Sequence, residues 1–158
     1  MKPTVADMMK AYAEDAVELA EKLGQKLDYS EDSIKSLEGI LQRYHEELPR
    51  GVRKIFRRGP SEHEKIQMSK AWGGYLGETI IKHLGGEWQR SSVSEDTIAL
   101  VVSKVINGED YPHEIYPPSK VYRRIINGPE DNVWHYYLVL KEDLSCDPAQ
   151  SAESCQEL

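Results

Sequence analysis

The sequence is poor in cysteine, has a single phenylalanine and contains no long apolar run. Its two cysteines, Cys146 and Cys155, lie near each other late in the chain, which excludes a disulfide framework and makes the cytoplasm the expected compartment. No segment approaches the ~18 consecutive apolar residues of a membrane-spanning helix. Acidic residues interrupt the apolar N-terminal segment and no small-residue cleavage site follows, so no signal peptide is expected.

Positive charge is also in short supply. The chain has 20 Lys and Arg residues against 27 Asp and Glu residues, which gives a net charge of −7. Nucleic-acid-binding proteins usually carry a basic surplus, so this composition argues against a general nucleic-acid binder. The contents of apolar residues (39%) and charged residues (30%) are those of an ordinary globular protein. A chain of 158 residues suffices for one domain with a hydrophobic core.

Two amphipathic helices are predicted in the first third of the chain. Residues 4–24 place apolar side chains at three- and four-residue steps, which is the period of one helical face. A second helix has its apolar face between Ile34 and Leu48. Asp28 or Ser30 is positioned to cap the N-terminus of this second helix.

The third predicted helix is unusual because it contains glycine. It begins at Ser61, where the sequence SEHE forms a capping box with Glu64, and it ends near Gly85. Glycine costs a helix interior about 0.5–1 kcal/mol relative to alanine. Gly73 and Gly77 lie beside an unusually wide apolar arc, so we expect a central helix on which these glycines admit a closely packed backbone. A phosphate cradle would instead place the glycines in a loop before the helix start.

The period of the apolar residues changes after this helix. The segments EWQR and TIALVVSKV predict strands, NGED predicts a turn, and YPHEIYP predicts a third strand whose prolines favour a sheet edge. Helical periodicity returns at Pro118, and the sequence NGP ends that helix at 127–129. Asp131 or Asn132 is positioned to cap a last helix.

The predicted fold class is therefore α+β. Three N-terminal helices and a short basic helix come first, followed by a small antiparallel sheet of about three strands and two C-terminal helices. Residues 1–144 are expected to form one globular domain. Residues 145–158 lack apolar periodicity and are expected to form a flexible tail.

The segment PRGVRKIFRRG, residues 49–59, carries the most concentrated positive charge in the chain. Its five cations recur at helical spacing and share one face: Arg50, Arg53, Lys54, Arg57 and Arg58. A smaller set repeats this arrangement on the first C-terminal helix: Lys120, Arg123 and Arg124. These cations either pair with acids of neighbouring helices or form a binding face for an acidic protein partner or a small anionic ligand. Nucleic acid is disfavoured as a partner because the rest of the chain is acidic.

A second interpretation places function in an aromatic pocket between the sheet and the C-terminal helices. The residues that would line it are Glu78, Trp88, Trp134 and Tyr137. Such a pocket would suit a small-ligand binder or a hydrolase. The same rings otherwise supply core volume in a chain that has one phenylalanine.

Established catalytic and metal-binding patterns give no match. Neither His45-Glu46 nor His63-Glu64 is followed by the second histidine of a zincin motif, and no Gly-x-Ser-x-Gly elbow occurs. No metal site and no cofactor are therefore predicted.

The sequences GGYLGE, GGEW and YPPSKVYRRIINGPEDNVWHYY together resemble small uncharacterised bacterial domains of unknown function. The resemblance covers about residues 61–140. It implies a bacterial source, but it carries no activity and no functional residue to this chain. From the residues themselves, the leading expectation is a non-catalytic interaction protein, of immunity-protein or adaptor type, that binds an acidic partner through its basic helical face.

Overall fold

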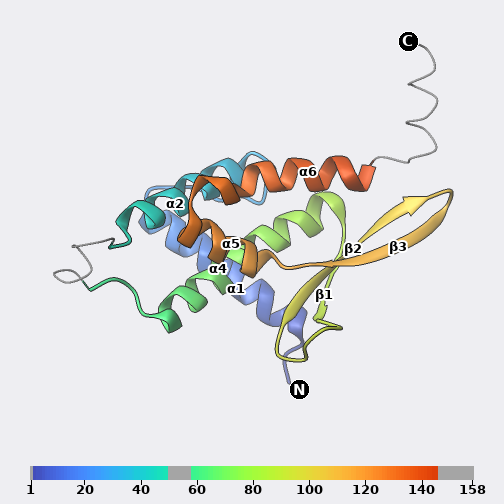
Figure 1. Cartoon of the computed structure of the whole chain (residues 1–158), viewed down its shortest axis with the longest axis horizontal. Coiled ribbons are helices and arrows are strands. Elements are labelled where there is room, and N and C mark those ends of the chain that lie inside the picture. The colour runs from blue at the N-terminus through green and yellow to red at the C-terminus, as the bar shows by residue number, and fades with distance from the viewer. Residues whose placement is uncertain (1, 50–57, 146–158) are drawn as a thin grey trace, which may run out of the picture.

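Five α-helices and one small sheet make up the part of the chain that this computed structural model describes, residues 2–49 and 58–145 (Figure 1). The elements in chain order are α1 (Val5–Lys22), α2 (Ser33–Glu47), α4 (Glu62–Leu84), β1 (Glu87–Arg90), β2 (Ile98–Ile106), β3 (Glu109–Ile115), α5 (Pro117–Asn127), the short 3₁₀ helix η1 (Pro129–Asp131) and α6 (Val133–Ser145). This order confirms the predicted α+β class. The predicted basic helix at 49–59 lies outside the described residues except at its ends, and the predicted tail lies outside them after Ser145.

Helix α4 runs through the middle of the molecule and contacts α1, α2, α5 and α6 (Figure 1). Every residue between Ala71 and Ile80 is buried except Glu78. An ordinary surface helix buries one stripe, whereas a helix with neighbours on several sides buries most of its circumference. The wide apolar arc in the sequence is thereby explained, and the prediction of a central helix is confirmed.

The glycines of α4 are the points at which its neighbours approach most closely. A Cβ atom on Gly73 would lie 2.4 Å from the Cα of Pro118 in α5, and one on Gly74 would lie 3.0 Å from the carbonyl oxygen of Met9 in α1. A Cβ on Gly77 would lie 2.1 Å from the ring of Trp88 in β1. Close packing of this kind offsets the helical cost of glycine, as predicted. At Gly77 the neighbour is an indole ring and not a backbone.

The three strands form one antiparallel sheet in the order β1-β2-β3. The turn between β2 and β3 is made by Asn107 and Gly108, whose φ angles of 53° and 79° are those of a two-residue hairpin turn. Leu100 and Val102 of β2 are fully buried. The far end of the β2–β3 hairpin extends beyond the helices (Figure 1), and β3 is an edge strand, as its proline predicted.

The ends of the helices follow the predicted caps with one difference. Ser61 and Glu64 form the reciprocal capping box of α4, and the side chain of Asn132 accepts a hydrogen bond from a backbone N–H in the first turn of α6. Helix α2 begins at Ser33, later than either predicted cap, and the residues before it form a turn. The N–H of Ser33 donates to the hydroxyl of Ser30 over 3.2 Å and to its carbonyl oxygen over 3.1 Å, so Ser30 still accepts from the first N–H of the helix.

Candidate functional site

Arg58 is the one cation of the predicted basic helix whose position the structure describes. The other four lie outside the described residues: Arg50, Arg53, Lys54 and Arg57. Arg58 is exposed and, within the described chain, has no ion-pair partner. It lies immediately before the N-terminus of α4 and contributes to the wall of a cavity between α2 and α4.

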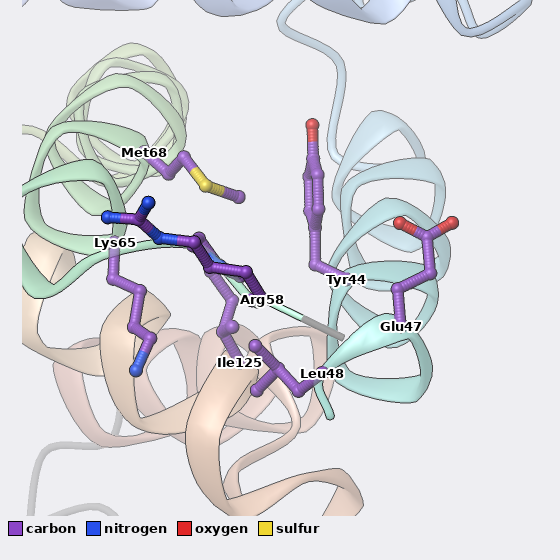
Figure 2. Close-up of a pocket in the computed structure, with 9 residues that line it drawn as sticks. Tyr44, Glu47, Leu48, Arg58, Lys65, Met68 and Ile125 are labelled. Carbon is purple, nitrogen blue, oxygen red and sulfur yellow. The ribbon is translucent and has the colours of Figure 1, made fainter. Parts of the chain in front are cut away.

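This α2–α4 cavity has a volume of about 230 Å³ (Figure 2). The residues around it are Tyr44, Glu47, Leu48, Arg58, Gly59, Pro60, Lys65, Met68 and Ile125. Figure 2 shows the Tyr44 ring on the α2 side, across from Met68 and Arg58. Burial raises the pKa of the Tyr44 hydroxyl, so this group stays protonated at neutral pH. The cavity therefore combines an apolar lining with two cations, one carboxylate and one phenol.

The cations of the α2–α4 cavity differ in how far their charge is neutralised. Lys65 donates to a carboxylate oxygen of Glu62 over 2.8 Å, on the same face of α4. Arg58 has no such neighbour in the described chain. A ligand carboxylate would therefore find its principal attraction at Arg58.

A second hollow, of about 270 Å³, lies between α4 and α5, and we call it the α4–α5 groove. Its lining residues are Ile66, Ser69, Lys70, Pro118, Ser119, Tyr122 and Arg123. The contact of Gly73 with Pro118 holds the N-terminal end of α5 against α4. The groove lies along α4 on the N-terminal side of that contact. Its α4 wall is formed by Ile66, Ser69 and Lys70, which have side chains, unlike Gly73.

The α4–α5 groove is positively charged. Lys70 contributes one cation from α4 and Arg123 contributes one from α5, and no carboxylate belongs to the lining. Lys70 has no ion-pair partner in the described part of the chain. Arg123 is 56% exposed and its Nε lies 3.8 Å from Asp131, a long contact that water screens. Both cations are thus available to an anionic group in the groove.

The second predicted set of cations, Lys120, Arg123 and Arg124, does not form one exposed face. Lys120 donates to Asp131 over 3.1 Å and its ammonium lies 5.3 Å from the centre of the Tyr136 ring. Arg123 is exposed, as expected. Arg124 is only 2% exposed, so its assignment to a binding face is wrong.

Arg124 belongs to a buried polar network that joins three helices. Its Nε donates to Glu38 of α2 over 2.6 Å, and its guanidinium also donates to Gln42. Glu38 further accepts from the side chain of Asn132 and from the backbone N–H of Val133, each over 3.0 Å. The helical spacing in the sequence placed Arg124 beside Arg123, but it held no signal for the partner 86 residues away. The network is structural.

The four residues of the predicted aromatic pocket contact one another as two pairs. Trp88 is 4% exposed, its ring packs on α4, and its indole N–H donates to Glu78 over 2.9 Å. Trp134 and Tyr137 stack on α6 with ring centroids 5.9 Å apart, and Tyr137 is fully buried with its hydroxyl donating to Glu31 of α2. The two pairs have different neighbours, and the rings supply core volume.

The carboxylate of Glu114 lies beside a shallow hollow on the sheet. It accepts hydrogen bonds from the backbone N–H of Ser92 (2.7 Å), the hydroxyl of Tyr116 (2.7 Å) and the hydroxyl of Ser91 (2.8 Å). These donors lower the pKa of Glu114 from 4.5 to about 2. A carboxylate held this firmly in its ionised form is a poor base, and it anchors the loop after β1 to the end of β3.

The described residues contain no group of three or more His, Cys, Asp or Glu side chains that could hold a metal ion. No helix among them has the length and apolar character required to cross a membrane.

The two hollows beside α4 are thus the candidate site, one at Arg58 and the other between Lys70 and Arg123. No protein-family model, no curated protein and no solved structure matches this sequence, so no relative supplies a function for either hollow.

Proposed function

We propose that the protein is a non-catalytic binding protein that recognises an acidic protein partner through the cationic surface around the N-terminal half of α4. This surface comprises Arg58 and the α4–α5 groove. In the sequence, Arg58 is preceded by the four other cations of the predicted basic helix, Arg50, Arg53, Lys54 and Arg57. An immunity-protein or adaptor role in the bacterial cytoplasm fits such a protein.

The observation that supports the proposal most directly is the lining of the α4–α5 groove. It holds two cations and no carboxylate, although the chain as a whole has seven more acidic than basic residues. The segment 50–58 adds five cations and no acid a few residues before α4. Charge segregated in this way favours complementary partners and speeds their association.

The size of the two hollows favours a protein partner over a small ligand. Pockets that enclose a small molecule usually measure about 300–1,000 Å³. The α2–α4 cavity, at about 230 Å³, lies below that range. A hollow of this size receives one or two side chains of a larger partner.

Binding of the full chain to poly-L-glutamate tests the proposal. The probe is fluorescently labelled and its anisotropy is followed at 20 and at 150 mM salt, since the attraction of exposed charges is screened over about 8 Å at the higher value. The wild type is expected to bind, and the affinity is expected to fall steeply with salt.

A matched pair of variants separates a local site from net charge. The first variant reverses three cations of the basic segment: Arg53→Glu, Arg57→Glu and Arg58→Glu. The second reverses three exposed lysines on or after α1: Lys10→Glu, Lys22→Glu and Lys26→Glu. We expect the first variant to lose about tenfold or more in affinity and the second to lose far less. Equal losses, or no binding by the wild type at low salt, would contradict the proposal.

A further inference from the structure

We infer that the α4–α5 groove is the docking site for a segment of the partner protein in which an aliphatic side chain is flanked by carboxylates. This inference rests on the proposed function. It names the part of the surface that recognises a specific sequence in the partner.

The groove offers an apolar surface that the described chain leaves uncovered. Ile66 is 45% exposed, whereas α4 is almost entirely buried from Ala71 to Ile80. Pro118 and the ring of Tyr122 face the same hollow from α5. An aliphatic side chain inserted here would contact apolar groups from both helices.

Two hydroxyl groups of the groove, those of Ser69 and Tyr122, do not compete with such a side chain. The hydroxyl of Ser69 donates to the carbonyl oxygen of Lys65 over 2.7 Å, within α4. The hydroxyl of Tyr122 donates to Glu62 over 2.9 Å. These hydroxyls already have acceptors, so an apolar group can cover them without leaving their protons unpaired.

The charges decide the chemistry on either side of the aliphatic residue. Lys70 lies on the α4 wall and Arg123 on the α5 wall, so a bound segment would have a cation on each side. Asp131 accepts from Asn127 over 2.8 Å and from Lys120 over 3.1 Å, and it lies 3.8 Å from Arg123. A carboxylate on the α4 side of the aliphatic residue would pair with Lys70, which has no ion-pair partner in the described chain, and one on the α5 side would add to the long, screened contact of Arg123 with Asp131.

The shape of the groove is fixed before binding. The contact of Gly73 with Pro118 determines the separation of α4 and α5 at one end of the groove. Both helices are anchored in the core through Trp72 of α4 and Val121 and Ile125 of α5, which are buried. A site formed in advance costs less ordering on binding, so a short peptide suffices to test it.

The test compares two fluorescein-labelled nonapeptides with equal charge, SGEELEEGS and SGEEGEEGS. The full chain is expected to bind the leucine peptide about tenfold more tightly than the glycine peptide, because one aliphatic side chain is removed from water. The double variant Lys70→Glu with Arg123→Glu is expected to lose binding of both peptides. Its charge-matched control, Lys22→Glu with Lys26→Glu, is expected to bind as the wild type does.

The variant Ile66→Ala isolates the apolar part of the inference. Ile66 is exposed, so the fold is expected to survive, and thermal melting checks this. In this variant the advantage of the leucine peptide over the glycine peptide should shrink to about twofold or less. An undiminished preference for leucine would overturn the assignment to this groove.

The remaining outcomes distinguish this inference from the proposed function. If both peptides bind equally and only the Arg53, Arg57 and Arg58 variant loses affinity, the groove inference fails while the proposed function stands. If neither these peptides nor poly-L-glutamate binds, both fail. The acidic segment 146–158 of this chain is added as a synthetic competitor. Displacement of the leucine peptide by that segment at equal concentration would assign the groove to this chain itself and overturn the partner proposal.

Discussion

Gly73 of α4 and Pro118 of α5 are packed so closely that the distance from a Cβ at position 73 to the Cα of Pro118 would be 2.4 Å. Real Cβ atoms do not approach a backbone atom to this distance, so any side chain at position 73 must push the helices apart. The contact therefore contributes to the stability of the packing between α4 and α5, and it sets the width of the α4–α5 groove.

Gly73→Ala is predicted to destabilise the protein by about 1–3 kcal/mol in urea denaturation, because overpacking outweighs the gain in helix propensity. The matched control is Gly39→Ala in α2, where an added Cβ would meet nothing within 4 Å. This control is expected to be neutral or stabilising by up to about 1 kcal/mol. If the two variants behave alike, the close contact at Gly73 does not exist in solution.

Gly77→Leu is predicted to cost several kcal/mol, about 3 or more, because the ring of Trp88 occupies the space that the new side chain needs. The same substitution in a Trp88→Ala background should cost much less, since the obstructing ring is gone. A double-mutant cycle from thermal or urea unfolding measures this difference. Additive effects of the two substitutions would show that the leucine meets some other obstacle.

The ion pair of Arg124 with Glu38 is predicted to be costly to break on one side. Glu38→Ala leaves a buried guanidinium without its carboxylate, and we expect a loss of about 3–5 kcal/mol. The exposed pair of Lys35 with Asp32, at 3.2 Å, provides the control: Lys35→Ala should change stability by less than about 1 kcal/mol. If both variants lose a similar free energy of unfolding, then leaving the buried Arg124 without its carboxylate is no more costly than breaking an exposed ion pair.

Local signals explain why the order of elements was predictable from the sequence. The capping box at Ser61 and the turn at Asn107 and Gly108 each lie within a few consecutive residues. The partner of Arg124 depends on how α2 packs on α5, and a helical wheel contains no information on that pairing. The α4–α5 groove was missed for the same reason, because its two walls come from residues 66–70 of α4 and 118–123 of α5, which are far apart in the sequence.

The lowered pKa of Glu114 predicts how the stability of the protein depends on pH in acid. Its pKa in the folded protein is about 2, lowered from 4.5 by three hydrogen-bond donors. A lowered folded-state pKa contributes stability that is complete above about pH 4.5 and is lost as the pH falls through about 2. The stability of Glu114→Gln should therefore fall less steeply than that of the wild type over this interval. Carbon-13 NMR of the Glu114 carboxyl measures the pKa directly, and a midpoint near 4.5 would refute the assignment.

The last prediction concerns whether the cations of the segment 50–58 pair within the protein or remain available to a partner. If they are available, the variant that carries Arg53→Glu, Arg57→Glu and Arg58→Glu should melt within a few degrees of the wild type at low salt. Exposed charges without partners contribute little to stability, so the wild type should also melt similarly at low and high salt.

Internal pairing gives the opposite result. The reversed side chains would then face the acids they had paired with, the variant would melt much earlier at low salt, and added salt would restore part of the difference by screening the repulsion. The variant with Lys10→Glu, Lys22→Glu and Lys26→Glu carries the same change in net charge and corrects for its general effect. Melting of all three proteins at 20 and 500 mM salt distinguishes the two arrangements. An early, salt-sensitive melt confined to the arginine variant would assign these cations to the fold and remove them from the binding surface.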